Sequence, residues 1–77
     1  MHATIYSRKD CPWCENAKNL CKVKGHSYTE VVIGEDISVE NFKAKYPDVR
    51  TVPYITMNES VIGGYLQLEE FLNQTIS

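Results

Sequence analysis

The chain has 77 residues, of which 43% are hydrophobic and 23% charged, and its formal net charge is -2. This composition predicts one small folded domain spanning residues 1–77 and argues against disorder. The charge balance provides no cationic surface for nucleic acid, and no apolar run approaches the roughly 18 residues of a membrane span. The N-terminus meets charge before any apolar run, so no signal peptide is expected. Three cysteines with one close pair argue against a secreted disulfide framework, which favours a cytoplasmic location.

The first half of the chain predicts a strand, a helix and a second strand. Residues 2–7 alternate β-branched and aromatic side chains, as a strand does. A helix is predicted from Pro12 to about Lys24, because apolar residues recur at helical spacing and Gly25 can end it. Residues 27–33 form the second predicted strand, which the turn-forming Gly-Glu-Asp sequence closes.

The second half predicts a helix, a hairpin and a last helix. Ser38 is a candidate N-cap for a helix that carries Val39, Phe42 and Tyr46 and must end before Pro47. Residues 53–58 and 60–64 form a predicted hairpin with Asn58 and Glu59 at its turn. The last helix, 66–75, is expected to pack Leu68, Phe71 and Leu72 inward.

The resulting order is β-α-β-α-β-β-α. A strand–helix–strand start implies a parallel pair, and the closing hairpin adds antiparallel strands. We therefore predict an α/β protein with a four-stranded mixed sheet and helices on both faces.

The sequence Cys11-Pro12-Trp13-Cys14 lies where the first helix begins. Proline favours the first helical position, which makes Cys11 the N-cap, where free N–H groups and the positive helix end stabilise a thiolate. Cys14 lies one turn further on the same face, so the two sulfurs can form a disulfide. A Cys-x-x-Cys pair in this setting indicates redox chemistry, with Cys11 attacking and the shielded Cys14 resolving the mixed disulfide.

Two other interpretations of the cysteines are an inert buried pair and a metal site. Cys11, Cys14, Cys21 and His26 have the residue types of zinc ligands. On one continuous helix, however, Cys14 and Cys21 are separated by about 10 Å along the axis and cannot bind one ion. We therefore predict no metal site and interpret Cys21 as a partly buried helix residue.

The whole chain resembles the glutaredoxin family, in particular the compact dithiol glutaredoxins of bacteria and their viruses. Three motifs carry the resemblance, in the family's order: Cys11-Pro12-Trp13-Cys14, Thr51-Val52-Pro53 and Gly63-Gly64. The resemblance implies a thioredoxin-like fold and glutathione as co-substrate, with no permanently bound cofactor.

The resemblance also implies roles for individual residues. Pro53 should follow a cis peptide bond, which presents the Val52 backbone to the cysteinyl part of glutathione; a trans proline opening a strand is the alternative. Arg8 matches a basic position that holds the glycine carboxylate, and Arg50 a second one near the same groove. Both arginines are equally compatible with solvated surface charges.

The remaining expected substrate contacts lie around the last helix. Gly63 and Gly64 let the backbone approach the γ-glutamyl group. The carboxylate of that group would accept hydrogen bonds from the N–H groups at the start of the helix. Trp13, Thr51 and Tyr65 are expected along this groove. At the position of the family's aspartate, which binds the γ-glutamyl ammonium, this chain departs from the pattern with the neutral Gln67.

By resemblance, the expected function is glutathione-dependent reduction of protein disulfides and glutathione mixed disulfides by a monomer, with ribonucleotide reductase among the family's protein targets. Two alternatives remain: a thioredoxin-like electron carrier recharged by a flavoprotein reductase, and an iron–sulfur carrier in which Cys11 and glutathione ligate a cluster. The rigid Pro12 after Cys11 argues against the iron–sulfur carrier.

Overall fold

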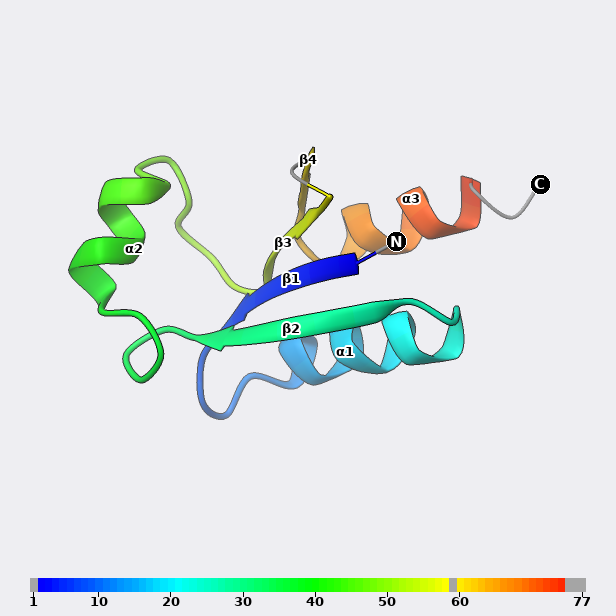
Figure 1. The fold of residues 1–77 in the computed structure, drawn as a ribbon, viewed down its shortest axis with the longest axis horizontal. Coiled ribbons are helices and arrows are strands. Elements are labelled where there is room, and N and C mark those ends of the chain that lie inside the picture. The colour runs from blue at the N-terminus through cyan, green and yellow to red at the C-terminus, as the bar shows by residue number, and fades with distance from the viewer. Residues whose placement is uncertain (1, 59, 75–77) are drawn as a thin grey trace.

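The computed structural model of the protein describes residues 2–58 and 60–74. Strands and helices follow the predicted order (Figure 1). They are β1 (His2–Ser7), α1 (Pro12–Val23), β2 (Ser27–Val32), α2 (Val39–Lys45), β3 (Tyr54–Met57), β4 (Ser60–Gly63) and α3 (Tyr65–Gln74). The predicted turn residue Glu59 and the predicted helix end at Thr75 lie outside the described residues. Within the described ranges, no helix has the length and apolar character needed to cross a membrane.

The four strands form one mixed sheet in the order β2-β1-β3-β4. β1 and β2 are parallel, with His2 opposite Ser27, and α1 is the crossover that a parallel pair requires. β3 runs antiparallel to both of its neighbours, β1 and β4, and pairs Met57 with Ala3 of β1. The predicted mixed sheet is confirmed, and β1 is one of its two central strands.

The hydrophobic core lies between one face of the sheet and the helices α1 and α3. Its fully buried members come from all of these elements: Ala3, Ile5, Ala17, Cys21, Ile55, Met57, Leu68 and Leu72. The two leucines are buried as predicted, and Phe71 packs against the cluster while remaining half-buried. Burying one such leucine stabilises the fold by about 1.5–3 kcal/mol, so this layer fixes α1, and with it the cysteine pair, against the sheet.

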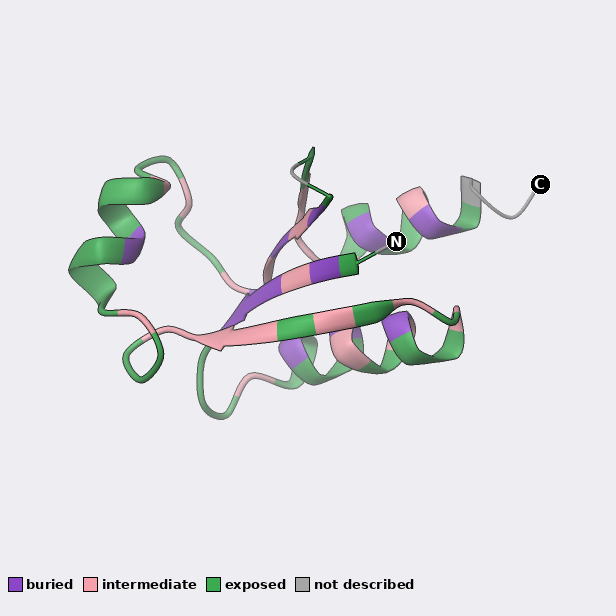
Figure 2. Ribbon diagram, in the orientation of Figure 1, coloured by how far each residue is buried: buried purple, intermediate pink, exposed green. Residues whose placement is uncertain are grey.

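The opposite face carries a smaller aromatic cluster under α2. Tyr6 of β1 lies 5.2 Å from Phe42 between ring centroids, and Tyr46 lies 4.8 Å from Tyr54 of β3. The helices therefore occupy both faces, as predicted, although most of α2 is exposed (Figure 2). Of the predicted apolar positions of this helix only Phe42 is buried; Val39 is 48% exposed, and Tyr46 is the C-cap.

Local side-chain and backbone contacts set the ends of these elements. Ser38 is the predicted N-cap of α2, and its Oγ accepts from the Asn41 N–H at 3.0 Å. β2 ends at Val32, one residue before its predicted end, because Asp36 Oδ2 accepts from the Val32 N–H at 2.9 Å and closes a turn. Gly25 follows α1 with φ 78°, a left-handed conformation that glycine adopts readily.

Candidate active site

The cysteine pair lies where α1 begins, four residues after the buried end of β1 at Ser7. Cys11 is the N-cap, with extended backbone at φ -111° and ψ 100°, and Pro12 is the first helical residue, both as predicted. The backbone N–H of Cys14 donates to Cys11 Sγ at 3.2 Å. This donor and the positive end of the helix favour negative charge on the Cys11 sulfur.

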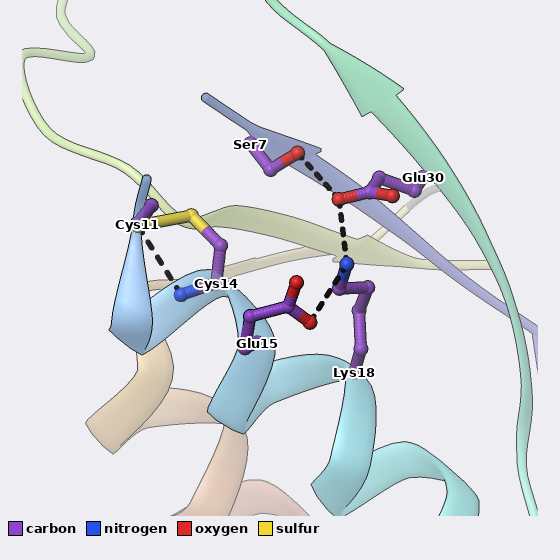
Figure 3. Close-up of a disulfide and its surroundings, with 6 residues drawn as sticks. All are labelled: Ser7, Cys11, Cys14, Glu15, Lys18 and Glu30. Atoms are coloured by element: carbon purple, nitrogen blue, oxygen red, sulfur yellow. Dashed lines mark hydrogen bonds and ion pairs between the residues drawn. A yellow bond between two sulfur atoms is a disulfide. The ribbon is translucent and has the colours of Figure 1, made fainter. Parts of the chain in front are cut away.

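The two cysteines form a disulfide in this structure, with their Cα atoms 5.2 Å apart (Figure 3). Cys11 is half-buried, whereas Cys14 is only 2% exposed. A thiol from another molecule can therefore reach the Cys11 sulfur more readily than that of Cys14. This difference in exposure fits the expected roles of attacking and resolving cysteine.

A groove of about 220 Å3 lies between Trp13, the loop before β3 and the start of α3. The Val52–Pro53 peptide bond in its wall is cis, as predicted. The Trp13 and Tyr65 rings meet at 5.3 Å between centroids and form one end of the groove. Its lining includes most of the expected substrate contacts: Trp13, Thr51, Val52, Pro53, Gly64, Tyr65 and Gln67. Leu66, which was not an expected contact, completes the lining.

Gln67 caps the N-terminus of α3, where the sequence analysis placed the carboxylate of the γ-glutamyl group. The Gly64 N–H donates to Gln67 Oε1 at 3.1 Å, so the third residue of α3 reaches back to the residue before the helix. One donor of the predicted carboxylate site therefore already has a partner within the protein. Gly63 is not part of the groove lining. Its φ of 114° favours glycine, and a Cβ atom at this position would lie 3.4 Å from Gln67 Cγ.

Arg8 and Arg50 lie outside this groove, in a neighbouring hollow of about 400 Å3 beside α2. The two hollows share Thr51 and Val52 as a common wall. The expected substrate residues are thus divided between a groove without charged side chains and a hollow with several cations.

A third hollow, of about 590 Å3, lies beside the disulfide and contains an ionic network that the sequence analysis did not identify. Lys18 Nζ lies 3.0 Å from Glu30 Oε2 and 2.9 Å from Glu15 Oε2 (Figure 3). The Ser7 hydroxyl, which is fully buried, donates to Glu30 Oε2 at 2.8 Å. We call this hollow, lined by Cys11, Cys14 and the network, the ionic hollow.

The network shifts the protonation equilibria of its members. Hydrogen bonding to Glu15, reinforced by Glu30, raises the pKa of Lys18. Hydrogen bonding to Lys18, followed by that from Ser7, lowers the pKa of Glu30. Both groups are therefore held in their charged forms beside the disulfide.

Cys21 belongs to the core and not to the active site. It is fully buried, and burial raises the pKa of its thiol, so it is a neutral packing residue. α1 runs without interruption from Pro12 to Val23, so Cys14 and Cys21 cannot bind one ion. In the described part of the chain, no group of three or more His, Cys, Asp and Glu residues could hold a metal ion.

The missed network had a weak signal in the sequence. Glu30 is the only charged residue of the predicted strand 27–33. Its register partner Ile5 is a core residue, so Glu30 faces the layer of α1. A charge at such a position needs a partner, and Lys18 on the crossover helix is the nearest cation in space.

The sequence profile of the glutaredoxin family matches residues 3–62. The chain is 32% identical over 68 residues to a hybrid peroxiredoxin of Haemophilus influenzae, covering 88% of this chain but 28% of that protein. It is 40% identical to a probable glutaredoxin of Synechocystis, covering 83% of this chain and 60% of that protein. A glutaredoxin of Haemophilus influenzae is 33% identical, with 96% of this chain and 93% of that protein covered.

Solved structures agree with this relationship. The reduced glutaredoxin of Escherichia coli superposes with a TM-score of 0.77 at 27% identity, covering 99% of this chain and 98% of that chain. The NrdH-redoxin of Escherichia coli, at 21% identity and a TM-score of 0.75, covers 96% of this chain and 93% of that chain, and shows the same fold. Because the family profile, the relatives and the fold agree, this chain belongs to the glutaredoxin family.

Proposed function

We propose that the protein reduces protein disulfides and glutathione mixed disulfides, and that glutathione restores its dithiol. The observation that carries this proposal is the groove between Trp13, Thr51–Pro53 and the start of α3, which lies next to the cysteine pair. Its walls offer an aromatic pair, exposed backbone and a helix N-terminus. A short peptide with a cysteine at its centre needs contacts of these kinds.

The proposed reaction uses the two sulfurs in turn. The Cys11 thiolate attacks one sulfur of the substrate disulfide, the substrate S–S bond breaks, and the other substrate sulfur leaves as a thiolate that takes up a proton. Cys14 then attacks the Cys11 sulfur, which releases the second substrate thiol and leaves the Cys11–Cys14 disulfide. Two glutathione molecules reduce that disulfide and are themselves oxidised to glutathione disulfide, so two electrons pass to the substrate.

The test is a steady-state assay that couples glutathione reductase and NADPH to the mixed disulfide of glutathione and 2-mercaptoethanol. We expect NADPH consumption that depends on both the protein and glutathione. Absence of glutathione-dependent turnover, in a protein whose cysteine pair still reduces a disulfide stoichiometrically, would contradict the proposal.

A second candidate function is that of an electron carrier recharged by a flavoprotein reductase. The contact between Gln67 and the Gly64 N–H favours it, because this contact occupies a donor on which glutathione would depend. The NrdH-redoxin that shares the fold is described as having a thioredoxin-like activity profile. Replacing glutathione and glutathione reductase by thioredoxin reductase in the same NADPH-coupled assay decides between the two functions.

The proposal includes protein disulfides as the physiological substrates, with ribonucleotide reductase as the family expectation, and a monomer working in the cytoplasm. The free, buried Cys21 supports a reducing location, since the protein keeps one thiol unpaired. Size-exclusion chromatography with light scattering measures the oligomeric state.

A further inference from the structure

The hollow beside α2 combines positive charge with an apolar floor, and we call it the cationic pocket. Arg8, Lys43 and Arg50 are its charged lining residues, and no acidic residue contributes to the lining. Its floor is apolar and is formed by Ile33, Val39, Phe42, Val49 and Val52. A neighbouring hollow of about 440 Å3 shares Lys43, Val49 and Arg50, so the cationic surface continues past the pocket.

The three cations of this pocket have no acidic partner among the described residues. Arg8, Lys43 and Arg50 form no ion pair there, whereas Lys9 pairs with one glutamate and Lys18 with two. The chain as a whole has a net charge of -2, so a site with cations alone is not a consequence of composition. Such a site attracts an anionic partner.

The position of the pocket relates it to the redox chemistry. It shares Thr51 and Val52 with the groove proposed for glutathione, and Arg8 with the ionic hollow that Cys11 lines. A substrate bound through its cysteine at Cys11 therefore lies near both the cationic pocket and the groove. Glutathione would offer the cationic pocket a single carboxylate and no apolar side chain to cover Val39, which is 48% exposed.

We propose that the cationic pocket binds an acidic segment of the protein substrate, directly C-terminal to the cysteine that Cys11 attacks. One or two carboxylates of this segment lie against Lys43 and the arginines, and a neighbouring apolar side chain lies on the Val39 side of the floor. The segment is placed C-terminal to the cysteine because the glycine of glutathione, which follows its cysteine, is expected at Arg8. The inference therefore rests on the proposed function. The cationic pocket gives the protein a preference among protein disulfides, which the binding of glutathione alone does not require.

The probes are short synthetic peptides with one cysteine held as a disulfide with 2-mercaptoethanol. In the first peptide Glu and Leu follow the cysteine, and in the second Gln and Leu follow it. In the third, Glu and Ala follow the cysteine, and in the fourth, Glu and Leu precede it. Each is mixed with fully reduced protein, and the peptide thiol is measured by acid quench and chromatography. The protein dithiol supplies both electrons and becomes the Cys11–Cys14 disulfide, so no glutathione is needed.

The matched variants are Lys43→Gln and Lys45→Gln. Both remove one positive charge from the last turn of α2, but Lys45 lies outside the pocket lining, with its Nζ 5.5 Å from the Tyr46 ring centroid. Circular dichroism and urea unfolding check that both variants fold. The two variants therefore differ in where the charge is lost and not in net charge.

We expect wild-type protein to reduce the first peptide faster than the other three, despite the negative net charge that disfavours acidic peptides. Lys43→Gln should slow reduction of the first peptide about two- to five-fold at low salt, as an exposed ion pair allows, and leave the second peptide unchanged. Lys45→Gln should change neither, and salt should remove the difference.

Equal rates for the first and second peptides, or equal effects of the two lysine substitutions, would overturn the inference. A fast fourth peptide would overturn its direction. Failure of the proposed function has a different signature: glutathione would not support turnover in the coupled assay, while the single-turnover rates of the four peptides would still differ.

Discussion

Two hollows near the Cys11–Cys14 disulfide have opposite chemical character. The groove of Trp13 and the start of α3 has no charged side chain in its lining and presents backbone, amide and aromatic groups. The ionic hollow is lined mainly by charged residues, and its half-buried cation, Lys18, already has two carboxylate partners. The groove presents uncharged groups to a ligand, whereas the central charges of the ionic hollow are compensated within the protein.

This difference suggests a division of tasks. Carboxylates that are already paired with a lysine gain little from a ligand, and displacing them would cost the network its hydrogen bonds. We therefore expect the groove to determine substrate affinity and the ionic network to stabilise the fold around the cysteines.

The largest effect should come from the two cysteines that lie near both hollows. Cys11→Ser removes the attacking thiolate and should reduce every activity to the uncatalysed background. Cys14→Ser should retain turnover of a glutathione mixed disulfide, because a second glutathione can release Cys11, but should lose dithiol reduction of protein disulfides. Both substrates are measured with both variants. If Cys14→Ser is the more damaging substitution with the mixed disulfide, the two roles are reversed.

The second prediction concerns the stability that the ionic network provides. Glu30→Gln removes the charge that pairs with Lys18, at 3.0 Å, and should lower the free energy of unfolding at pH 7 by about 1 kcal/mol. Lys9 and Glu35 form an equally short pair at 3.0 Å, but their side chains are 74% and 50% exposed. Glu35→Gln, the matched control, should therefore cost less than about 0.5 kcal/mol.

The pH dependence of the same variant distinguishes charge from packing. Because the folded-state pKa of Glu30 lies below its ordinary value of 4.5, its stabilisation is present above pH 4.5 and is lost as pH falls through the folded pKa. The raised pKa of Lys18 keeps the partner charged over that whole range. Urea unfolding at pH 7 and at pH 3 should show the difference between wild type and Glu30→Gln shrinking in acid. A difference that stays constant would attribute the loss to packing.

The comparison of the two hollows also shows what the sequence could predict. Local signals predicted the elements well: Pro12 placed Cys11 at the N-cap, Ser38 capped α2, and Gly25 ended α1. The motif Thr51-Val52-Pro53 led to the groove and to its cis bond through resemblance to a family. These features are encoded within a few neighbouring residues.

Features that depend on long-range placement were not predicted. Glu30 and Lys18 belong to different elements. Lys43 of α2 and Arg8, which follows β1, likewise come from separate parts of the chain and line one pocket. The exposure of Val39 follows from the position of α2 over one end of the sheet. Likewise, the neutral Gln67 was recognised as a departure from the family pattern, but its bond to Gly64 depends on the shape of the turn.

The smallest predicted effect tests the uncharged groove directly, at Gln67. A neutral amide accepts a hydrogen bond worth about 0.5–1.5 kcal/mol, whereas a bond to a charged partner contributes about 1.5–3 kcal/mol. Gln67→Asp should therefore improve use of a glutathione mixed disulfide by about 1 kcal/mol, several-fold in kcat/KM at low salt. The gain should decrease at high salt, because the groove is open to solvent.

Two further variants identify the source of that gain. Asn73→Asp adds the same charge near the other end of α3, at an exposed position, and should have little effect. Gln67→Ala frees the Gly64 N–H without adding charge. If alanine improves kcat/KM as much as aspartate does, release of that donor explains the gain, and the wild-type amide competes with the ligand carboxylate. If aspartate has no advantage at low salt, Gln67 does not face the γ-glutamyl group, and recharging by a flavoprotein reductase becomes the better explanation of an uncharged groove.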